Sequence, residues 1–189
     1  IAKEGGVEGA LRASARCQAC SVEALVFVDA MCAHPRSFLS VAAAAADVAK
    51  AVTPESLVHG ARVLARLCGR AEGRGEVVKA KRDVSAALLA ALAAAPDPPA
   101  RAVGDAANVL SAIVDADGKE ATYLARKSAV DVFLGKLACV EDDAAAARDV
   151  ARLLMRLVEG GIAELVRRLE QTGDARAAKL LAALAADGA

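Results

Sequence analysis

One helical pattern recurs along the whole chain. Five segments share small residues at the start, then an apolar pair, then a second apolar pair at the end: residues 22–32, 58–68, 104–114, 148–158 and 175–185. Their last positions are spaced by 36, 46, 44 and 27 residues. Spacings of roughly 40 to 47 residues are typical of helical repeat arrays, in which one supersecondary unit stacks on the next. The pattern predicts such an array, with degenerate repeats at the two ends.

Further periodic pieces lie between these segments. Residues 75–96 and 118–142 align with each other, each as a short polar helix followed by a more apolar one. With the recurring segment that follows, this gives three helices per repeat. The predicted repeats are residues 1–33, 34–69, 70–115, 116–158 and 159–189.

Two Gly-Gly phrases occupy the joint between the first two helices of a repeat. They are EGGV at residues 4–7 and EGGI at residues 159–162. Glycine is unfavourable inside a helix but adopts positive φ without strain, so it permits a sharp reversal. In the two middle repeats the equivalent position holds Asp83 and Ser128. We therefore expect a helix joint at each of these places.

The phrases IAKEGGVEGAL and EGGIAELVRRL, each followed by a helix of the AxxxL kind, resemble the entry to the second helix of armadillo repeats. The resemblance implies an all-α fold, a right-handed superhelical α-solenoid of four to five armadillo-like repeats in a single domain over residues 1–189. Residues 34–52 lack the glycines, and Asp83 and Ser128 replace them in the middle repeats. A generic HEAT-like solenoid is therefore the alternative.

Other local signals agree with this division. Thr53-Pro54-Glu55 combines a helix-capping residue, a proline and an early acid, which predicts a helix start near residue 54. The Pro-Asp-Pro-Pro stretch at residues 96–99 predicts the end of one helix and a stiff link to the next.

Composition favours a helical, intracellular protein. Apolar residues make up 56% of the chain and aromatic residues only 2%, and Lys+Arg and Asp+Glu both number 24. This balance excludes a bulk field that would draw the whole protein onto nucleic acid or an anionic membrane. Five cysteines, an odd number, do not form a disulfide framework and predict a cytoplasmic or nuclear location. No uncharged run reaches the roughly 20 residues of a membrane-spanning helix.

The two ends of the chain are apolar. The sequence opens on Ile1 within a repeat, and Leu180, Leu181 and Leu184 lie near its other end. A solenoid needs polar caps at its termini. We expect these ends to be covered by further repeats, a partner chain or self-association, and the chain to be a fragment or a processed product.

The armadillo resemblance also implies where a partner would bind, namely a concave groove lined by the third helix of each repeat. Armadillo proteins of the nuclear-import adaptor type bind basic peptides there through a Trp and, four residues on, an Asn. The Trp places hold Val26, Arg62, Asn108, Arg152 and Lys179 in this chain, and the Asn places hold Ala30, Arg66, Ala112, Arg156 and Ala183. The chain departs from the import pattern at every repeat, so a basic peptide is not the expected ligand.

Arginines replace the import residues in two repeats. Residues four apart share a helix face, so Arg62 lies beside Arg66, and Arg152 beside Arg156. Guanidinium groups pair with carboxylates in a bidentate manner, which predicts an acidic peptide or helix as the partner. The predicted groove residues are Arg62, Arg66, Asn108, Arg152, Arg156 and Lys179. The alternative is that these arginines only form the solvated face of amphipathic helices.

A second basic feature consists of two dyads 45 residues apart, Lys81-Arg82 and Arg126-Lys127. We place both on the short first helix of a middle repeat, as a convex patch for phosphates or acidic tails. Solvated surface is the alternative here too.

Chemical motifs are sparse. Cys17 and Cys20 have the spacing of a redox or metal pair, but no second pair completes a zinc site. Asp115-Ala-Asp117-Gly118 begins like a calcium loop and lacks the later ligands. The sequence also has no phosphate-binding glycine loop, nucleophile elbow or HExxH motif. We predict no catalytic residue, metal or cofactor.

The predicted function is therefore a non-enzymatic scaffold that binds a protein partner, an acidic peptide or helix, in its groove. One alternative is a nucleic-acid-binding HEAT-like module, against which the absence of Trp and the zero net charge argue. The other is an all-helical redox protein or enzyme, for which a reactive Cys17 or Cys20 would be the signature.

Overall fold

The computed structural model describes residues 19–158 without a break, together with residues 6, 9, 10, 166, 167, 170, 171, 173 and 178. Within this part every regular element is a helix, so the prediction of an all-α chain is confirmed there. None of the described helices combines the length and the apolar character that crossing a bilayer requires.

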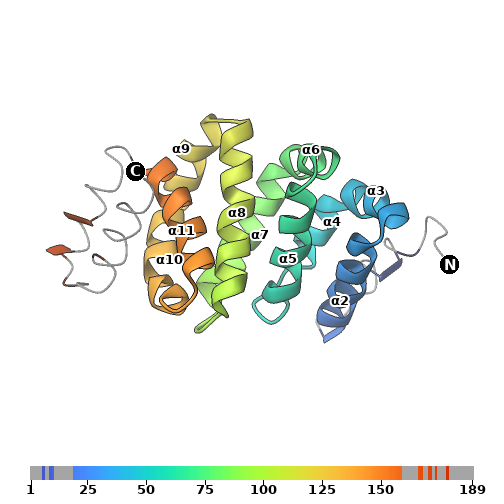
Figure 1. The fold of residues 1–189 in the computed structure, drawn as a ribbon, viewed down its shortest axis with the longest axis horizontal. Helices are drawn as coiled ribbons and strands as arrows, with labels where there is room; N and C mark the ends of the chain where they lie inside the picture. Colours follow the sequence, from blue (N-terminus) through green and yellow to red (C-terminus); the bar gives the residue numbers. More distant parts are fainter. Residues whose placement is uncertain are drawn as a thin grey trace. The chain divides into compact units, whose positions relative to one another are not determined.

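The chain divides into two compact units, residues 1–96 and 97–189. The described helices of the first unit are α2 (Ala19–Ala33), α3 (Pro35–Ala43), α4 (Ala45–Lys50), α5 (Leu57–Cys68), α6 (Ala71–Lys79) and α7 (Lys81–Ala94). Those of the second unit are α8 (Ala100–Ala116), α9 (Lys119–Arg126), α10 (Ala129–Gly135), the 3-10 helix η1 (Leu137–Val140) and α11 (Ala144–Leu157) (Figure 1). The boundary falls in the predicted proline-rich link, where α7 has ended and α8 has not yet begun.

Four of the five recurring segments coincide with long helices. Residues 22–32, 58–68 and 104–114 lie within α2, α5 and α8, and residues 148–158 lie in α11 except for the last. The fifth segment, residues 175–185, belongs almost wholly to the part outside the described residues, as do Ile1, Leu180, Leu181 and Leu184. Most members of the recurring apolar pairs lie in the core, Leu64, Leu67, Leu110 and Leu154 being fully buried, whereas Phe27 of the first segment is 48% exposed.

The joints between short helices differ from the predicted positions in one repeat. Ser128 precedes α10 with φ 57°, a left-handed conformation of the kind the glycine position was expected to require. Asp83 lies in the first turn of α7, whereas the joint before α7 is Ala80 with φ −89° and ψ 15°. The Asp83 prediction was wrong because an ordinary right-handed turn at Ala80 reverses the chain without positive φ. Gly5, Gly160 and Gly161 lie outside the described residues.

Helix α5 also starts later than predicted. Its first residue is Leu57 rather than a residue near 54, and residues 54–56 form a turn. Thr53 N donates to Ser56 Oγ at 2.8 Å, and Ser56 N donates to Thr53 Oγ1 at 3.3 Å. These reciprocal bonds close the turn, so the Thr-Pro-Glu signal marks the entry to the helix and not its first residue.

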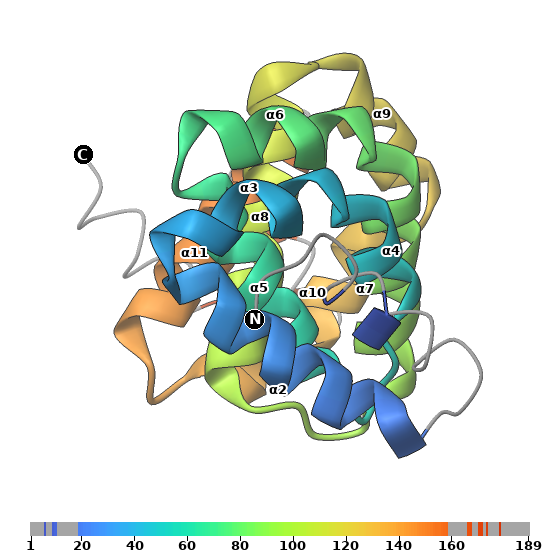
Figure 2. The same cartoon turned by 90° about the vertical axis from the view of Figure 1, so that its right-hand side faces the viewer.

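Within each unit an α-helix packs on the third α-helix after it in the chain. In the first unit α2 packs on α5, α3 on α6 and α4 on α7. In the second unit α8 packs on α11. The two views of the ribbon show α2 lying beside α5 in the first unit (Figures 1 and 2). A periodicity of three helices is therefore present in the packing as well as in the sequence.

Helices α8 and α11 are in close contact at Gly104. A Cβ atom on Gly104 would lie 2.7 Å from Ala146 Cα and 2.8 Å from Ala146 Cβ. Real Cβ atoms do not come this near to backbone, so only glycine allows α11 to lie at this distance from α8. Gly60 of α5 is also crowded, but there the nearest atom would be Val52 Cγ2, at the tip of a side chain.

Candidate binding surface

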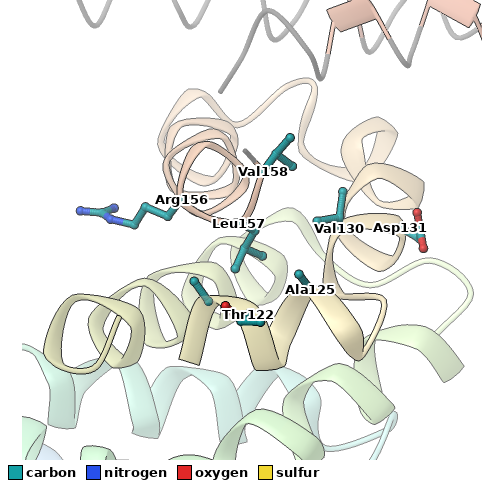
Figure 3. A pocket seen from close by; sticks show the side chains of 8 residues that line it. Thr122, Ala125, Val130, Asp131, Arg156, Leu157 and Val158 are labelled. Carbon is teal, nitrogen blue, oxygen red and sulfur yellow. The ribbon is translucent and has the colours of Figure 1, made fainter. Parts of the chain in front are cut away.

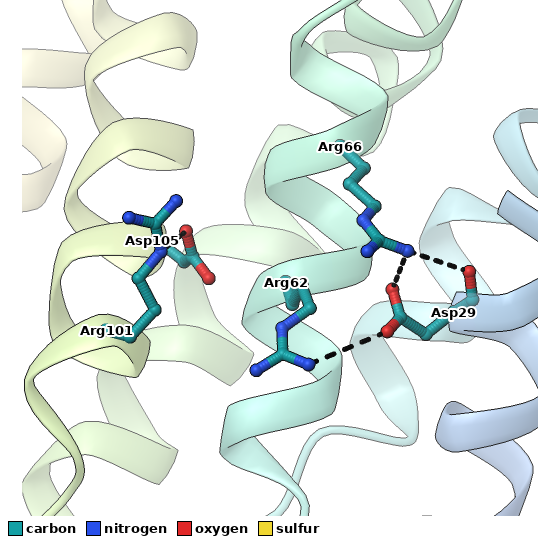
Figure 4. Close-up of polar contacts among 5 residues, drawn as sticks. All are labelled: Asp29, Arg62, Arg66, Arg101 and Asp105. Atoms are coloured by element: carbon teal, nitrogen blue, oxygen red, sulfur yellow. Dashed lines mark hydrogen bonds and ion pairs between the residues drawn. The ribbon is translucent and has the colours of Figure 1, made fainter. Parts of the chain in front are cut away.

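The exposed face of α5 carries two of the predicted groove residues, and both reach one carboxylate on α2. Arg66 Nη1 donates to Asp29 Oδ1 at 2.7 Å and to the Asp29 backbone oxygen at 3.0 Å. Arg62 Nη1 lies 3.8 Å from Asp29 Oδ2 (Figure 4). We call Asp29, Arg62 and Arg66 the Asp29 cluster. Two guanidinium groups against one carboxylate give it a formal charge of +1.

Burial within the Asp29 cluster is uneven. The Asp29 side chain is 14% exposed, whereas those of Arg62 and Arg66 are 38% and 45% exposed. The carboxylate is thus held down between α2 and α5, and the guanidinium groups cover it from the solvent side. A ligand approaching this face would meet arginine before aspartate.

The α8 helix contributes one predicted groove residue, Asn108, whose side chain is half-buried. Two turns earlier, Arg101 Nε lies 3.3 Å from Asp105 Oδ1, the carboxylate being one helical turn further on (Figure 4). Asp105 is buried and Arg101 is exposed. The α8 face is therefore less basic than that of α5.

The α11 helix carries the other two arginines, and each has a carboxylate of its own. Arg156 Nε lies 2.8 Å from Asp115 Oδ1, and its Nη2 donates to Asp115 Oδ2 at 3.2 Å, which is a bidentate pair between α11 and α8. Arg152 Nη1 lies 3.4 Å from Asp149 Oδ1, one turn earlier in α11. We call these four residues the α11 cluster. Its formal charge is zero, since two arginines face two aspartates.

The environment of Asp149 in the α11 cluster changes the pKa of its carboxyl group. Burial raises the pKa of Asp149 above its ordinary 3.8, and this outweighs the charges of Arg152, Arg101 and Arg148, which lower it. Asp143 raises it further. The surrounding guanidinium groups thus offset only part of the free-energy cost of removing water from this carboxylate.

Large apolar side chains are also exposed on the helices α2 and α11. Val26 and Phe27 of α2 are 45% and 48% exposed, and Met155 of α11 is 43% exposed. Val26 stands at the first of the places that hold a Trp in import adaptors, one helical turn before Asp29. The candidate surface therefore combines apolar and cationic contacts.

Sequence reasoning found the arginines and missed their partners. Asp29 and Asp115 are 37 and 41 residues away from Arg66 and Arg156, on the previous long helix of the same unit. The available signal was an acidic residue near the end of each preceding recurring segment. The remaining predicted groove residue, Lys179, lies outside the described residues.

The four residues of the proposed second patch do not share the predicted location. Lys81 and Arg82 open α7, the second helix of their repeat, rather than its short first helix. Arg126 ends α9 and Lys127 follows it, as predicted. Lys127 Nζ lies 5.9 Å from the centre of the Tyr123 ring, so part of its interaction is with the protein itself.

A hollow of about 530 Å³ lies in the second unit, among α9, α10 and the end of α11 (Figure 3). Apolar side chains such as Ala125, Val130 and Leu157 line it, together with Thr122 and Asp131. Arg156 is the only predicted groove residue among its described lining residues.

The described thiols show no activation. Burial raises the pKa of Cys32, and it raises the pKa of Cys68 to about 12. Burial and the hydrogen bond to Asp97 raise the pKa of Cys139, which is only half-buried. Cys17 and the side chain of Cys20 lie outside the described part. Among the described residues, no group of three His, Cys, Asp or Glu side chains is placed to hold a metal ion.

Comparison of the chain with protein-family models, with curated proteins and with solved structures finds no match. The armadillo resemblance therefore stays a prediction from the sequence.

Proposed function

We propose that the chain is a non-enzymatic protein-binding scaffold, an α-solenoid of armadillo-like repeats whose long third helices bind an acidic peptide or helix. The observation that carries this proposal is the position of the arginines. Arg62, Arg66, Arg152 and Arg156 all lie on the exposed faces of the long helices α5 and α11, where the repeat pattern puts the groove.

The packing by threes supports the solenoid part of the proposal. In an array of three-helix repeats, each helix contacts its equivalent in the next repeat. The contacts of α2 with α5, α3 with α6, α4 with α7 and α8 with α11 follow this rule inside each unit. Ser128, which turns the chain with positive φ between α9 and α10, matches the expected joint of an armadillo-like repeat.

Surface chemistry supports the binding part. Helix α2, whose Asp29 pairs with both arginines of α5, also exposes Val26 and Phe27, and interfaces favour such a mixture of Arg and large apolar residues. Free cysteines at positions 32, 68 and 139 agree with a reducing, intracellular location, cytoplasmic or nuclear.

The experiment is a pull-down that compares two variants with the same change in net charge. The groove variant carries Arg62→Gln, Arg66→Gln, Arg152→Gln and Arg156→Gln. The patch variant carries Lys81→Gln, Arg82→Gln, Arg126→Gln and Lys127→Gln. Glutamine avoids the repulsion that Glu would suffer beside Asp29 and Asp115, and thermal melts establish that both variants fold.

We expect proteins with acidic segments to be retained by the wild type and by the patch variant, and lost from the groove variant. Capture of the same proteins by all three chains would show that the arginines are solvated surface. If the patch variant alone fails to capture these proteins, the binding surface lies at the Lys81-Arg82 and Arg126-Lys127 dyads.

A further inference from the structure

Arg62 differs from the other described groove arginines in its hydrogen bonds. Arg66, Arg152 and Arg156 each donate to a carboxylate, at 2.7, 3.4 and 3.2 Å. Arg62 approaches its nearest carboxylate oxygen only to 3.8 Å, which is an ion pair beyond hydrogen-bond distance. Within the described part of the chain its N–H groups therefore donate to no protein acceptor.

The Asp29 carboxylate accepts a hydrogen bond from Arg66 and none from Arg62. Arg66 fixes both the side chain and the backbone oxygen of Asp29. Asp29 is only 14% exposed, so its carboxylate is confined between α2 and α5. Arg62, at 38% exposure, keeps a planar fork of donors that can receive a second carboxylate from outside.

An exposed apolar side chain lies on the same surface of α2 as Asp29, the carboxylate nearest to Arg62. Val26 precedes Asp29 by three residues on α2, so the two side chains are neighbours on the helix surface. Val26 is 45% exposed, although a buried position would be usual for valine. A partner that places a carboxylate on Arg62 can therefore cover Val26 with an adjacent side chain.

We propose that Arg62 is the anchor of the binding surface, and that it takes a peptide carboxylate whose neighbouring residue is aliphatic and packs on Val26. Asp29 then acts as an internal competitor, because it neutralises part of the charge that the ligand would use. The proposal rests on the proposed function and adds to it the anchoring residue and the acidic–aliphatic pattern of the partner.

The test is fluorescence anisotropy with three labelled peptides on the full chain. The probe peptide carries Glu-Leu pairs separated by Gly-Ser, and its two controls carry Gln-Leu pairs or Glu-Gly pairs. We expect the wild type to bind the Glu-Leu peptide at least about tenfold more tightly than either control, because both the charge and the aliphatic contact contribute.

The variants compare arginines at equivalent places in the repeat pattern. Arg62→Gln is expected to weaken binding of the Glu-Leu peptide about tenfold, and Arg152→Gln, its match in α11, by less than about threefold. Val26→Ser should reduce Glu-Leu binding to the level of the Glu-Gly peptide. Asp29→Asn should strengthen binding several-fold, because the Asp29 cluster then loses its only negative charge.

Each other outcome has a definite meaning. If Arg152→Gln or Arg156→Gln weakens binding and Arg62→Gln does not, the acidic-peptide scaffold stands and Arg62 is not its anchor. If the Gln-Leu peptide binds as tightly as the Glu-Leu peptide, or if no peptide binds to the wild type, both the anchor and the proposed acidic partner are overturned.

Discussion

The α2–α5 pair of the first unit and the α8–α11 pair of the second are held together by different contacts. Both join long helices, and in each pair the second is the third α-helix after the first. The first pair is bridged at its exposed edge by one nearly buried aspartate shared between two arginines. The second is bridged by a one-to-one bidentate pair and brought together at a glycine.

This difference shows that two pairs of long helices can be held together by different contacts, and that the net charge of the exposed face differs between them. The Asp29 cluster retains a positive charge, and the α11 cluster is neutral. A basic sequence pattern shared by two helices therefore does not give two equal binding surfaces. If the proposed acidic partner binds, we expect the charge that remains after internal pairing to decide which of the two surfaces attracts it.

The largest expected effect concerns the glycines of the two units. Gly104→Ala should lower the free energy of unfolding by about 1–3 kcal/mol, because the new Cβ meets the backbone of Ala146, which a rotamer change cannot move. Gly60→Ala should lower it by less, because the clash there is with one methyl group of Val52 rather than with backbone, and Ala favours the helix. Thermal and urea denaturation of both variants would measure the contrast, and equal losses would contradict it.

Substituting the more buried of the two bridging aspartates should cause the larger loss in the free energy of unfolding. Asp29→Asn is expected to cost about 1–2 kcal/mol, because two guanidinium groups lose a carboxylate that is 14% exposed. Asp115→Asn should cost at most about 1 kcal/mol, because that carboxylate is 54% exposed. Urea denaturation at low salt tests the order, and a larger loss for Asp115→Asn would reverse the comparison.

A smaller, pH-dependent effect belongs to the second unit. Burial raises the pKa of Asp149 in the folded chain, so the protonated carboxyl favours folding, and this contribution is lost as the pH rises through the raised pKa. The stability of Asp149→Asn relative to the wild type should therefore increase as the pH rises above 3.8, the ordinary pKa of the carboxyl group. Urea midpoints at several pH values measure it. A relative stability that falls over this range would mean that the guanidinium groups outweigh burial.

The smallest effect is a difference in thiol reactivity, without a change in stability. Cys32 and Cys68 are buried in α2 and α5 of the first unit, and Cys139 is half-exposed in the second. Among these three, Cys139 should be alkylated first. The pKa is raised in all three thiols, so the difference in reactivity follows from solvent access, which is limited at Cys32 and Cys68. Peptide mapping after timed alkylation resolves the sites. Faster labelling of Cys68 than of Cys139 would contradict the packing of α5.

Much of the fold follows from the sequence because the long helices bury repeated apolar pairs. Segments 22–32, 58–68 and 104–114 could be placed within helices from their periodicity. The joint at Ala80 could not, because Ala makes its turn with ordinary dihedral angles and leaves no signal in the sequence. The sharing of Asp29 by Arg62 and Arg66 was also not predictable, because it depends on how α2 and α5 are aligned in space.

The most direct test of the acidic-partner surface is an NMR titration of the 19.1 kDa chain with the Glu-Leu peptide, following backbone amide shifts. The account predicts that the largest shift changes fall on the exposed faces of α2 and α5, around Val26, Asp29 and Arg62, with smaller ones on α11. Changes concentrated in α6, α7 or α9, or no saturable change at all, would contradict it.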